Sequence, residues 1–371
     1  MKLGVPKETA AGERRVALVP DAIKKLAAKD VTVTVEAGAG TEANISDQAY
    51  GEVGASTGAA WSCEAVAKVA PPSAEEIGRL GQGSVLIGFL DPLGSPETTK
   101  ALAAAGISAF AMEAVPRISR AQSADALSSQ ATVAGYRAAL IAAQELERFF
   151  PMLTTAAGTI RPAKVLVLGA GVAGLQAIAT AKRLGARVSA FDVRAAVAEQ
   201  VESLGASFLD LGIGSDAEGE GGYARELTEE EREAQQRALG ERTAQFDVVI
   251  TTALVPGRPA PRLITAATVA AMKPGSVIVD MAGEAGGNCE LSEAGQTVVR
   301  DGVTIVAPLG LPSTMAEHAS QLYARNVSAL LDLMVVDGKL ELDFEDEVIK
   351  GACITHGGEI VHEGAKKAAA A

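Results

Sequence analysis

The segment Val165–Gly174 constrains the fold more than any other stretch of the chain. Its sequence is Val-Leu-Val-Leu-Gly-Ala-Gly-Val-Ala-Gly. Four apolar residues in succession are typical of a strand that is buried on both faces of a parallel sheet. Gly169, Gly171 and Gly174 then have the spacing of the turn that joins a strand to a helix in dinucleotide-binding domains. The segment therefore predicts a parallel α/β sheet with a nucleotide at the start of the following helix.

Each of these glycines has its own predicted role. Gly169 permits the tight turn, Gly171 lets the backbone approach a pyrophosphate, and Gly174 lets the helix pack closely against its strand. The bare pattern is weak by itself, because packing alone can also require such glycines. Here a helix and a second strand, predicted over 187–191, lead to Asp192 about twenty positions after the turn. This context predicts a nucleotide-binding domain.

Asp192 distinguishes between the two nicotinamide dinucleotides. A carboxylate at the end of the second strand accepts hydrogen bonds from the adenosine ribose hydroxyls and repels a 2′-phosphate. Asp192 therefore favours NAD(H) over NADP(H). Arg194 argues in the other direction, since an arginine at this place can accommodate the 2′-phosphate.

Composition excludes several other classes of function. A formal net charge of −13 disfavours binding to nucleic acid or to an anionic membrane surface. Cys63, Cys289 and Cys353 are far apart in the sequence, which favours a reducing compartment without disulfides. The three histidines do not have the spacing of metal ligands, and the first residues predict a strand and not a signal peptide. We therefore expect a cytoplasmic protein without a metal site.

The predicted elements divide the chain into two parallel α/β domains. Strand-like runs alternate with helical runs near the N-terminus, at 2–5, 31–36, 84–90 and 107–112. A second series of strands lies at 165–168, 187–191, 206–209, 246–251, 276–280 and 303–307. The residues after the second series are too few for a third domain. We therefore predict a discontinuous first domain of residues 1–130 and 314–371, a nucleotide-binding Rossmann domain of residues 131–313, and long helices that join them.

Two polar segments interrupt these patterns. Residues 116–130 fit neither a helix nor a strand in their first half, which predicts a loop running into a helix near Asp125. A purely structural loop is possible, but Arg, Gln and Asp in a loop beside a cofactor domain favour a function. Residues 216–242 combine a charge run, typical of a solvated helix, with Gly221-Gly222-Tyr223. The paired glycines predict a flap with hinge freedom.

Several segments together resemble the alanine dehydrogenase and proton-translocating transhydrogenase superfamily, and they span nearly the whole chain. They are Val5-Pro6-Lys7-Glu8, Arg14–Leu18 and Lys273–Asp280. The polar segment Arg117–Ser128 resembles the nicotinamide loop of the NAD(H)-binding component of transhydrogenases. Glu284–Cys289 and Gly221–Ala224 match that branch as well. The resemblance implies two Rossmann-like domains and direct exchange of hydride between two nicotinamides.

The same comparison weighs against an alanine dehydrogenase. In that branch a lysine and a histidine work beside an early arginine, and this chain has Ala70 and Asp91 where they align. The branch's later aspartate is Glu284, and only Arg15 remains. A soluble alanine-type amino-acid dehydrogenase is therefore the first alternative. A non-catalytic NAD sensor, which would need no nicotinamide loop, is the second.

The resemblance also implies a set of site residues. Arg117, Asp125 and Ser128 are expected to hold the carboxamide and ribose end of NAD(H), and Gln122 to lie where the second nucleotide meets the first. Arg117, Gln122 and Asp125 are the expected catalytic residues. The remaining expected contacts are Ile118 and Ser119 in the loop, Val172 and Ala173 at the turn, Asp192, Val193 and Arg194 on the adenosine side, and Gly222, Tyr223, Gln235 and Leu254 closing over the nucleotide.

Partners follow from the resemblance alone. NADP(H) is expected on a separate NADP(H)-binding beta subunit. Protons are expected to cross through membrane-spanning subunits, one of which is a separate, membrane-spanning portion of the alpha subunit. The chain itself is expected to form a homodimer, without nucleic acid, at the inner face of the cell membrane.

Overall fold

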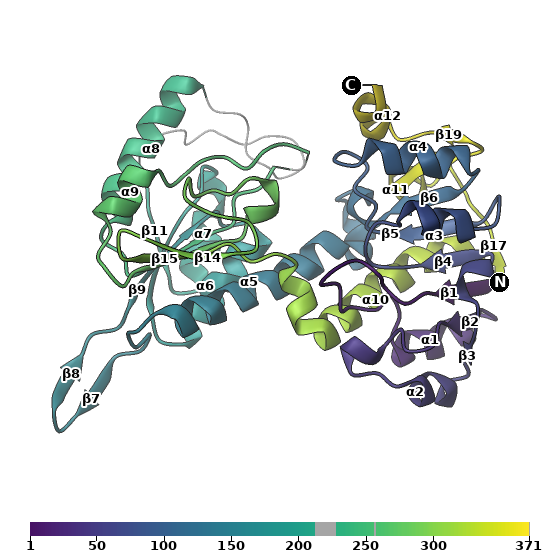
Figure 1. Ribbon diagram of the computed structural model, residues 1–371, viewed down its shortest axis with the longest axis horizontal. Helices are drawn as coiled ribbons and strands as arrows, with labels where there is room; N and C mark the ends of the chain where they lie inside the picture. Colours follow the sequence, from purple (N-terminus) through teal and green to yellow (C-terminus); the bar gives the residue numbers. More distant parts are fainter. Residues whose placement is uncertain (212–227, 256, 371) are drawn as a thin grey trace. The chain divides into compact units, whose positions relative to one another are not determined.

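The chain folds into two compact units in the computed structural model, which describes residues 1–211, 228–255 and 257–370. Unit 1 consists of Met1–Gln130 and Pro312–Ala371, and unit 2 of Ala131–Leu311. Figure 1 shows a sheet with surrounding helices in each unit. Both sheets are largely parallel, which confirms the predicted class of two α/β domains.

Unit 1 contains an eight-stranded sheet in the order β19-β18-β6-β5-β4-β1-β2-β3. Its strands are β1 (Lys2–Val5), β2 (Thr32–Val35), β3 (Ser56–Thr57), β4 (Ala65–Ala67), β5 (Val85–Gly88), β6 (Ser108–Ala111), β18 (Cys353–His356) and β19 (Glu359–Ile360). The first six are parallel, whereas β18 pairs antiparallel with β6 and with β19. The C-terminal segment thus completes the sheet that the N-terminal segment begins.

Helices cover both faces of this sheet, because the side chains of β5 are buried on each face. Val85 and Ile87 belong to one buried apolar cluster and Leu86 to another, so the strand is apolar at successive positions. The helices of unit 1 are α1 (Pro20–Ala27), α2 (Asp47–Glu52), α3 (Ala74–Arg79), α4 (Pro96–Ala104), α10 (Ala316–Met334), α11 (Glu347–Ala352) and α12 (Glu363–Ala370). A small ribbon of β16 (Val335–Val336) and β17 (Lys339–Leu340) follows α10.

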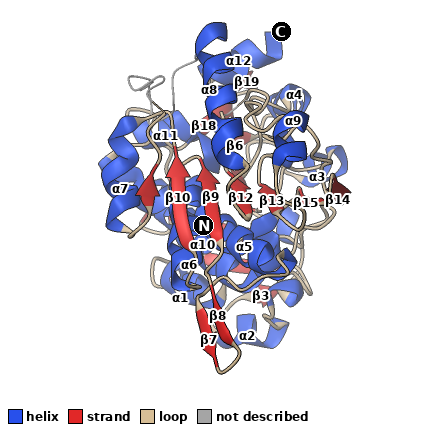
Figure 2. Cartoon of the chain, turned by 90° about the vertical axis from the view of Figure 1, so that its left-hand side faces the viewer, coloured by secondary structure: helices blue, strands red, loops and turns tan. Residues whose placement is uncertain are grey.

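Unit 2 contains a seven-stranded sheet in the order β11-β10-β9-β12-β13-β15-β14. Figure 2 shows its central strands in a row. The strands are β9 (Lys164–Leu168), β10 (Arg187–Phe191), β11 (Ser207–Phe208), β12 (Val248–Thr251), β13 (Val277–Asp280), β14 (Thr297–Arg300) and β15 (Val303–Val306). About six parallel strands were predicted, and the structure adds β14 as an antiparallel edge strand.

Both faces of β9 are buried, as the uninterrupted apolar run predicts. Val165 and Val167 belong to one apolar cluster, and Leu166 and Leu168 belong to the other. Helix α5 (Ala126–Glu145) begins in unit 1 and continues into unit 2, whose other helices are α6 (Val172–Arg183), α7 (Ala198–Ser203), α8 (Glu229–Thr243) and α9 (Ala266–Ala271). This arrangement fixes the glycine turn at the carboxyl end of a rigid central strand.

A β-hairpin of unit 2 has no counterpart in the prediction. Strands β7 (Leu153–Thr155) and β8 (Gly158–Ile160) pair antiparallel. Figures 1 and 2 show this hairpin extending away from the unit 2 sheet. The preceding helix was predicted to continue to about Phe149, but α5 ends at Glu145.

Within the described residues, no helix is long and apolar enough to cross a membrane.

Candidate functional site

The glycine turn has the geometry that the sequence predicts at two of its three positions. Gly169 has a φ of +97°, a backbone angle that residues other than glycine rarely adopt. A Cβ on Gly174 would lie 1.9 Å from the carbonyl oxygen of Gly169, so no other residue fits there without a shift of the backbone. Both glycines are therefore required by the fold of the turn itself.

Gly171 differs from its two neighbours in the motif. Its φ of −75° suits any residue, and a Cβ built on it would have no atom of the described residues within 4 Å. It is the N-cap of α6, and among the described residues this helix has no side-chain cap at its N-terminus. Open space therefore faces the positive end of a twelve-residue helix, which suits an anionic group.

Asp192 lies beside this turn and is tied to it. Its Oδ2 accepts a hydrogen bond from the amide of Ala170 at 2.8 Å. The side chain of Arg194 donates to both carboxylate oxygens at 2.9 Å, and the Arg194 amide donates to Oδ1. Burial alone raises the pKa of Asp192, but the hydrogen bonds from Arg194 and Ala170 outweigh it and hold the pKa below its usual value.

Arg194 therefore pairs with the carboxylate that was expected to bind ribose. A carboxylate has about four acceptor positions, and the four donors from Ala170 and Arg194 use that capacity. A ribose hydroxyl would have to take the place of one of the Arg194 contacts.

Other expected nucleotide contacts of unit 2 lie at the same edge of the sheet. Val172 and Leu254 are exposed apolar side chains, at 42% and 46%. Ala173 and Val193 are half-buried. The structure thus brings together the expected residues that follow β9, β10 and β12, namely Gly169, Gly171, Val172, Ala173, Gly174, Asp192, Val193, Arg194 and Leu254.

Three expected contacts remain outside this group. Gly222 and Tyr223 lie outside the described residues, as does the rest of the predicted flap. Gln235 lies in α8, within the charge run that was predicted to be helical.

The expected nicotinamide loop belongs to unit 1. Its first half forms a 3-10 helix, Ser119–Ala124, and not the irregular loop that was predicted. Arg117, Ser119 and Gln122 are exposed, and Ile118 is half-buried. Asp125 and Ser128 lie together at the start of α5, where Ser128 donates to Asp125 through its amide at 2.9 Å and its hydroxyl at 2.6 Å.

Two contacts attach this loop to the helices of unit 1. The guanidinium of Arg120 donates to both oxygens of Asp346 at 2.6 and 2.9 Å, and Asn326 on α10 donates to the Ser123 carbonyl at 2.9 Å. Asp346 is the N-cap of α11 and also accepts from two amides of that helix. The hydrogen bonds of Arg120 are the main reason why the pKa of Asp346 falls to about 2.

The low pKa of Asp346 predicts a pH-dependent stability. A carboxyl with a depressed folded-state pKa stabilises the fold above its unfolded pKa of 3.8, and this stabilisation is lost as the pH falls toward 2. We expect Asp346→Asn to lower the Tm by about 2–4 °C at pH 6. The difference from the wild type should shrink between about pH 4 and pH 2 in thermal scans. A difference that stays constant over this range would contradict the assignment.

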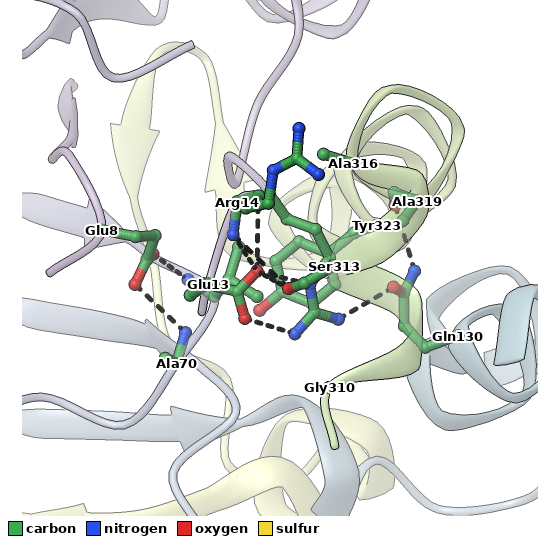
Figure 3. Close-up of polar contacts among 12 residues, drawn as sticks. Glu8, Glu13, Arg14, Ala70, Gln130, Gly310, Ser313, Ala316, Ala319 and Tyr323 are labelled. Carbon is green, nitrogen blue, oxygen red and sulfur yellow. Dashed lines mark hydrogen bonds and ion pairs between the residues drawn. The ribbon is translucent and has the colours of Figure 1, made fainter. Parts of the chain in front are cut away.

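Arg15, the residue expected to be shared with the dehydrogenase branch, has hydrogen-bond partners within its own chain. Its guanidinium donates to Glu13 at 2.6 Å and to Gln130 at 2.9 Å. Figure 3 shows the contact between Glu13 and Ser313, with Gln130 nearby. Burial raises the pKa of Glu13, but hydrogen bonds from Arg15 and Ser313 outweigh this effect and lower it. Arg15 is thus held by a carboxylate of its own chain.

A buried charge cluster beside Arg15 was not predicted. Lys68 is 1% exposed, and its ammonium lies 2.9 Å from Glu76 and 3.6 Å from Glu8. Glu8 in turn accepts from the amide of Ala70, the position that the resemblance aligned with a lysine of the dehydrogenase branch. A lysine between apolar strand residues was the signal that could have revealed this cluster.

A groove of about 1220 Å³ occupies the opposite, amino-terminal edge of the unit 2 sheet. Its basic residues are Arg148, Arg161, Lys164, Arg187 and Lys273, and the base of the β7–β8 hairpin supplies exposed apolar side chains. Arg148 pairs with Asp247 at 2.7 Å.

The described portion of the chain contains no cluster of three His, Cys, Asp or Glu side chains suited to a metal.

Comparison with known protein families shows which family the chain belongs to. The family described as "Alanine dehydrogenase/PNT, N-terminal domain" matches residues 4–134, and its C-terminal domain matches residues 138–363. The chain belongs to the alanine dehydrogenase/PNT family. This membership confirms the resemblance that the motifs indicated.

Its relatives include members of both branches of this family. An NAD(P) transhydrogenase alpha-subunit chain of Rhodospirillum rubrum, named as the first portion of that subunit, is 50% identical over 376 residues, with 98% of each chain covered. The alanine dehydrogenase of Bacillus subtilis is 30% identical, over 98% of this chain and 93% of that protein. The transhydrogenase branch is therefore the more similar one.

Solved structures rank the two branches in the same order of similarity. A transhydrogenase structure from Sinorhizobium meliloti has a TM-score of 0.86 and 46% identity, with 98% of this chain and 99% of that chain covered. An L-alanine dehydrogenase structure has a TM-score of 0.83 and 27% identity, with 99% of each covered. The two branches of the family share this fold.

Proposed function

We propose that this chain is the NAD(H)-binding component of a proton-translocating transhydrogenase. The observation that carries the proposal is the open N-terminus of α6, where Gly171 leaves room for a pyrophosphate beside Asp192. The 50% identity to an alpha-subunit chain of an NAD(P) transhydrogenase supports the same choice. NAD(H) is the nucleotide proposed for this chain, and NADP(H) is assigned to a partner component.

The proposed reaction is direct hydride transfer between NADH and NADP. It requires close approach, ring orientation and exclusion of water, but no general acid or base at the reacting carbons. Ala70 and Asp91 replace the lysine and histidine of the dehydrogenase branch, and Arg15 is taken up by Glu13. Arg117, Asp125 and Ser128 are the residues proposed to orient the nicotinamide end, with Gln122 toward the incoming NADP(H).

The proposed partners are a membrane-spanning portion of the alpha subunit on a separate chain, an NADP(H)-binding beta subunit and a second copy of this chain. The Rhodospirillum rubrum relative is named as one portion of an alpha subunit, which supports a divided subunit. Exposed Phe149, Met152 and Ile160 around the β7–β8 hairpin support self-association. Coupling to proton translocation and a peripheral location at the inner face of the cell membrane belong to the same proposal.

Replacement of Asp192 tests the nucleotide assignment. We expect Asp192→Ala to weaken NADH binding by about 1–3 kcal/mol, the scale of hydrogen bonds to an ionised group. Calorimetric titration with NADH and with NADPH measures the affinities, and Asp21→Ala, an exposed aspartate of α1, is the matched control. A wild-type chain that binds NADPH more tightly than NADH would overturn the assignment.

The rival activity has its own assay. An alanine-type dehydrogenase would oxidise NADH with pyruvate and ammonia, without any other protein. We expect no such turnover, because Arg15 is held by Glu13 and Gln130. Robust turnover would favour the dehydrogenase alternative.

A further inference from the structure

We infer that Asp280 and Asn288 form a buried brace that positions the nucleotide-facing loop after β12. This loop consists of Thr252, Ala253 and Leu254, and the inference rests on the proposed function because Leu254 is assigned to the nucleotide site. Both brace residues are completely buried. We assign them as positioning residues, since they act through the loop.

Asp280 is the centre of the brace. Its Oδ1 accepts hydrogen bonds from the Thr251 hydroxyl and from the amides of Ala282 and Asn288, at 2.9 to 3.2 Å. Its Oδ2 accepts from the amide of Cys289 at 2.9 Å and from the hydroxyl of Ser292 at 2.6 Å. A carboxylate without a proton offers acceptors alone, about four positions in all, and these five donors use its full capacity. Asp280 therefore fixes the turn that follows β13.

Asn288 connects this turn to the loop after β12. Its amide nitrogen donates to the carbonyls of Ala253 at 2.9 Å and Pro261 at 2.8 Å. Its amide oxygen accepts from the Ala253 amide at 3.1 Å. The side chain thus satisfies both backbone groups of Ala253, the residue directly before Leu254. Such a buried, satisfied polar network specifies one geometry.

The loop is also held from its other side. The hydroxyl of Thr252 donates to the carbonyl of Gly169 at 3.0 Å, which ties the loop to the glycine turn. The amide of Ala253 lies 3.3 Å from the place that a Cβ on Gly169 would occupy. Leu254 is therefore presented from a backbone that is anchored on both sides, and it does not have to be ordered when the nucleotide binds.

Variants at Asn288 test the brace through NADH binding. We expect Asn288→Ala to raise the Kd for NADH about tenfold, and Asn288→Asp at least as much, because Asp keeps the size but cannot donate to the two carbonyls. Gln296→Ala is the matched control, since it shortens an exposed amide side chain that lies after Asn288 in the sequence and outside the brace. We expect its Kd to stay within about twofold of the wild type.

Hydrogen exchange separates positioning from general destabilisation. In Asn288→Ala, amides of residues 253–264 should exchange faster, while those of 165–168 in β9 stay protected. Faster exchange in both segments, or an unchanged Kd in a folded variant, would overturn the inference. If Asn288→Ala does not fold, Thr252→Val decides, with an expected rise in Kd of about threefold. A wild-type chain that fails to bind NADH would refute the proposed function, and the exchange pattern would still test the brace.

Discussion

Alanine at Gly171 is expected to leave the fold intact and to weaken NADH binding about tenfold or more, which corresponds to about 1.4 kcal/mol or more. The backbone at Gly171 is in a conformation open to any residue, and a Cβ there would have no described atom within 4 Å. The methyl group would instead occupy the space proposed for the pyrophosphate. Circular dichroism and thermal unfolding should report a native fold, while NADH titration reports the loss.

Gly174 provides the matched comparison. Its Cβ would lie 1.9 Å from the carbonyl oxygen of Gly169, so Gly174→Ala must displace the backbone of the turn. Overpacking of this kind costs about 1–3 kcal/mol, and we expect a lower Tm together with lost binding. The two variants therefore separate a glycine kept for the ligand from a glycine kept for packing. Wild-type NADH affinity in Gly171→Ala would exclude the pyrophosphate from this turn.

The local features of the site could be predicted from the sequence. Gly169, Gly174 and Asp192 act within one strand-turn-helix-strand unit, where spacing along the chain determines spacing in the fold. The pairing of Arg194 with Asp192 is also local, but the sequence allowed two uses of that arginine. The structure shows it folded onto the carboxylate.

The non-local features could not be predicted. Asp280 and Asn288 contact Thr251 and Ala253, about thirty residues earlier in the chain. Lys68, which follows β4, pairs with Glu8, which follows β1. Buried polar contacts of this type depend on the strand order, which no local pattern specifies. The β7–β8 hairpin was not predicted for a different reason. Its short threonine-containing strands are largely exposed and do not show an apolar period.

Replacing Arg117 or Gln122 with alanine is expected to slow hydride transfer by about 10²-fold, since a small misplacement of reacting groups has an effect of this size. The expected change in the Kd for NADH is much smaller. Both side chains lie on the exposed surface of a loop that Asp346 and Asn326 hold in place. We therefore expect them to act on the approach of the second nicotinamide more than on retention of the first.

The rate is measured in a mixture of this chain, the NADP(H)-binding component, NADH and NADP, and the Kd is measured on this chain alone. Ser123→Ala is the control from the same loop, because its side chain is exposed and its backbone carbonyl keeps the contact with Asn326. We expect this control to retain the wild-type rate. Equal, small losses of rate and affinity in Arg117→Ala and Gln122→Ala would show that the loop only contributes to binding. A selective loss of rate would place the loop at the contact between the two nucleotides, where a reaction without acid or base chemistry depends on geometry alone.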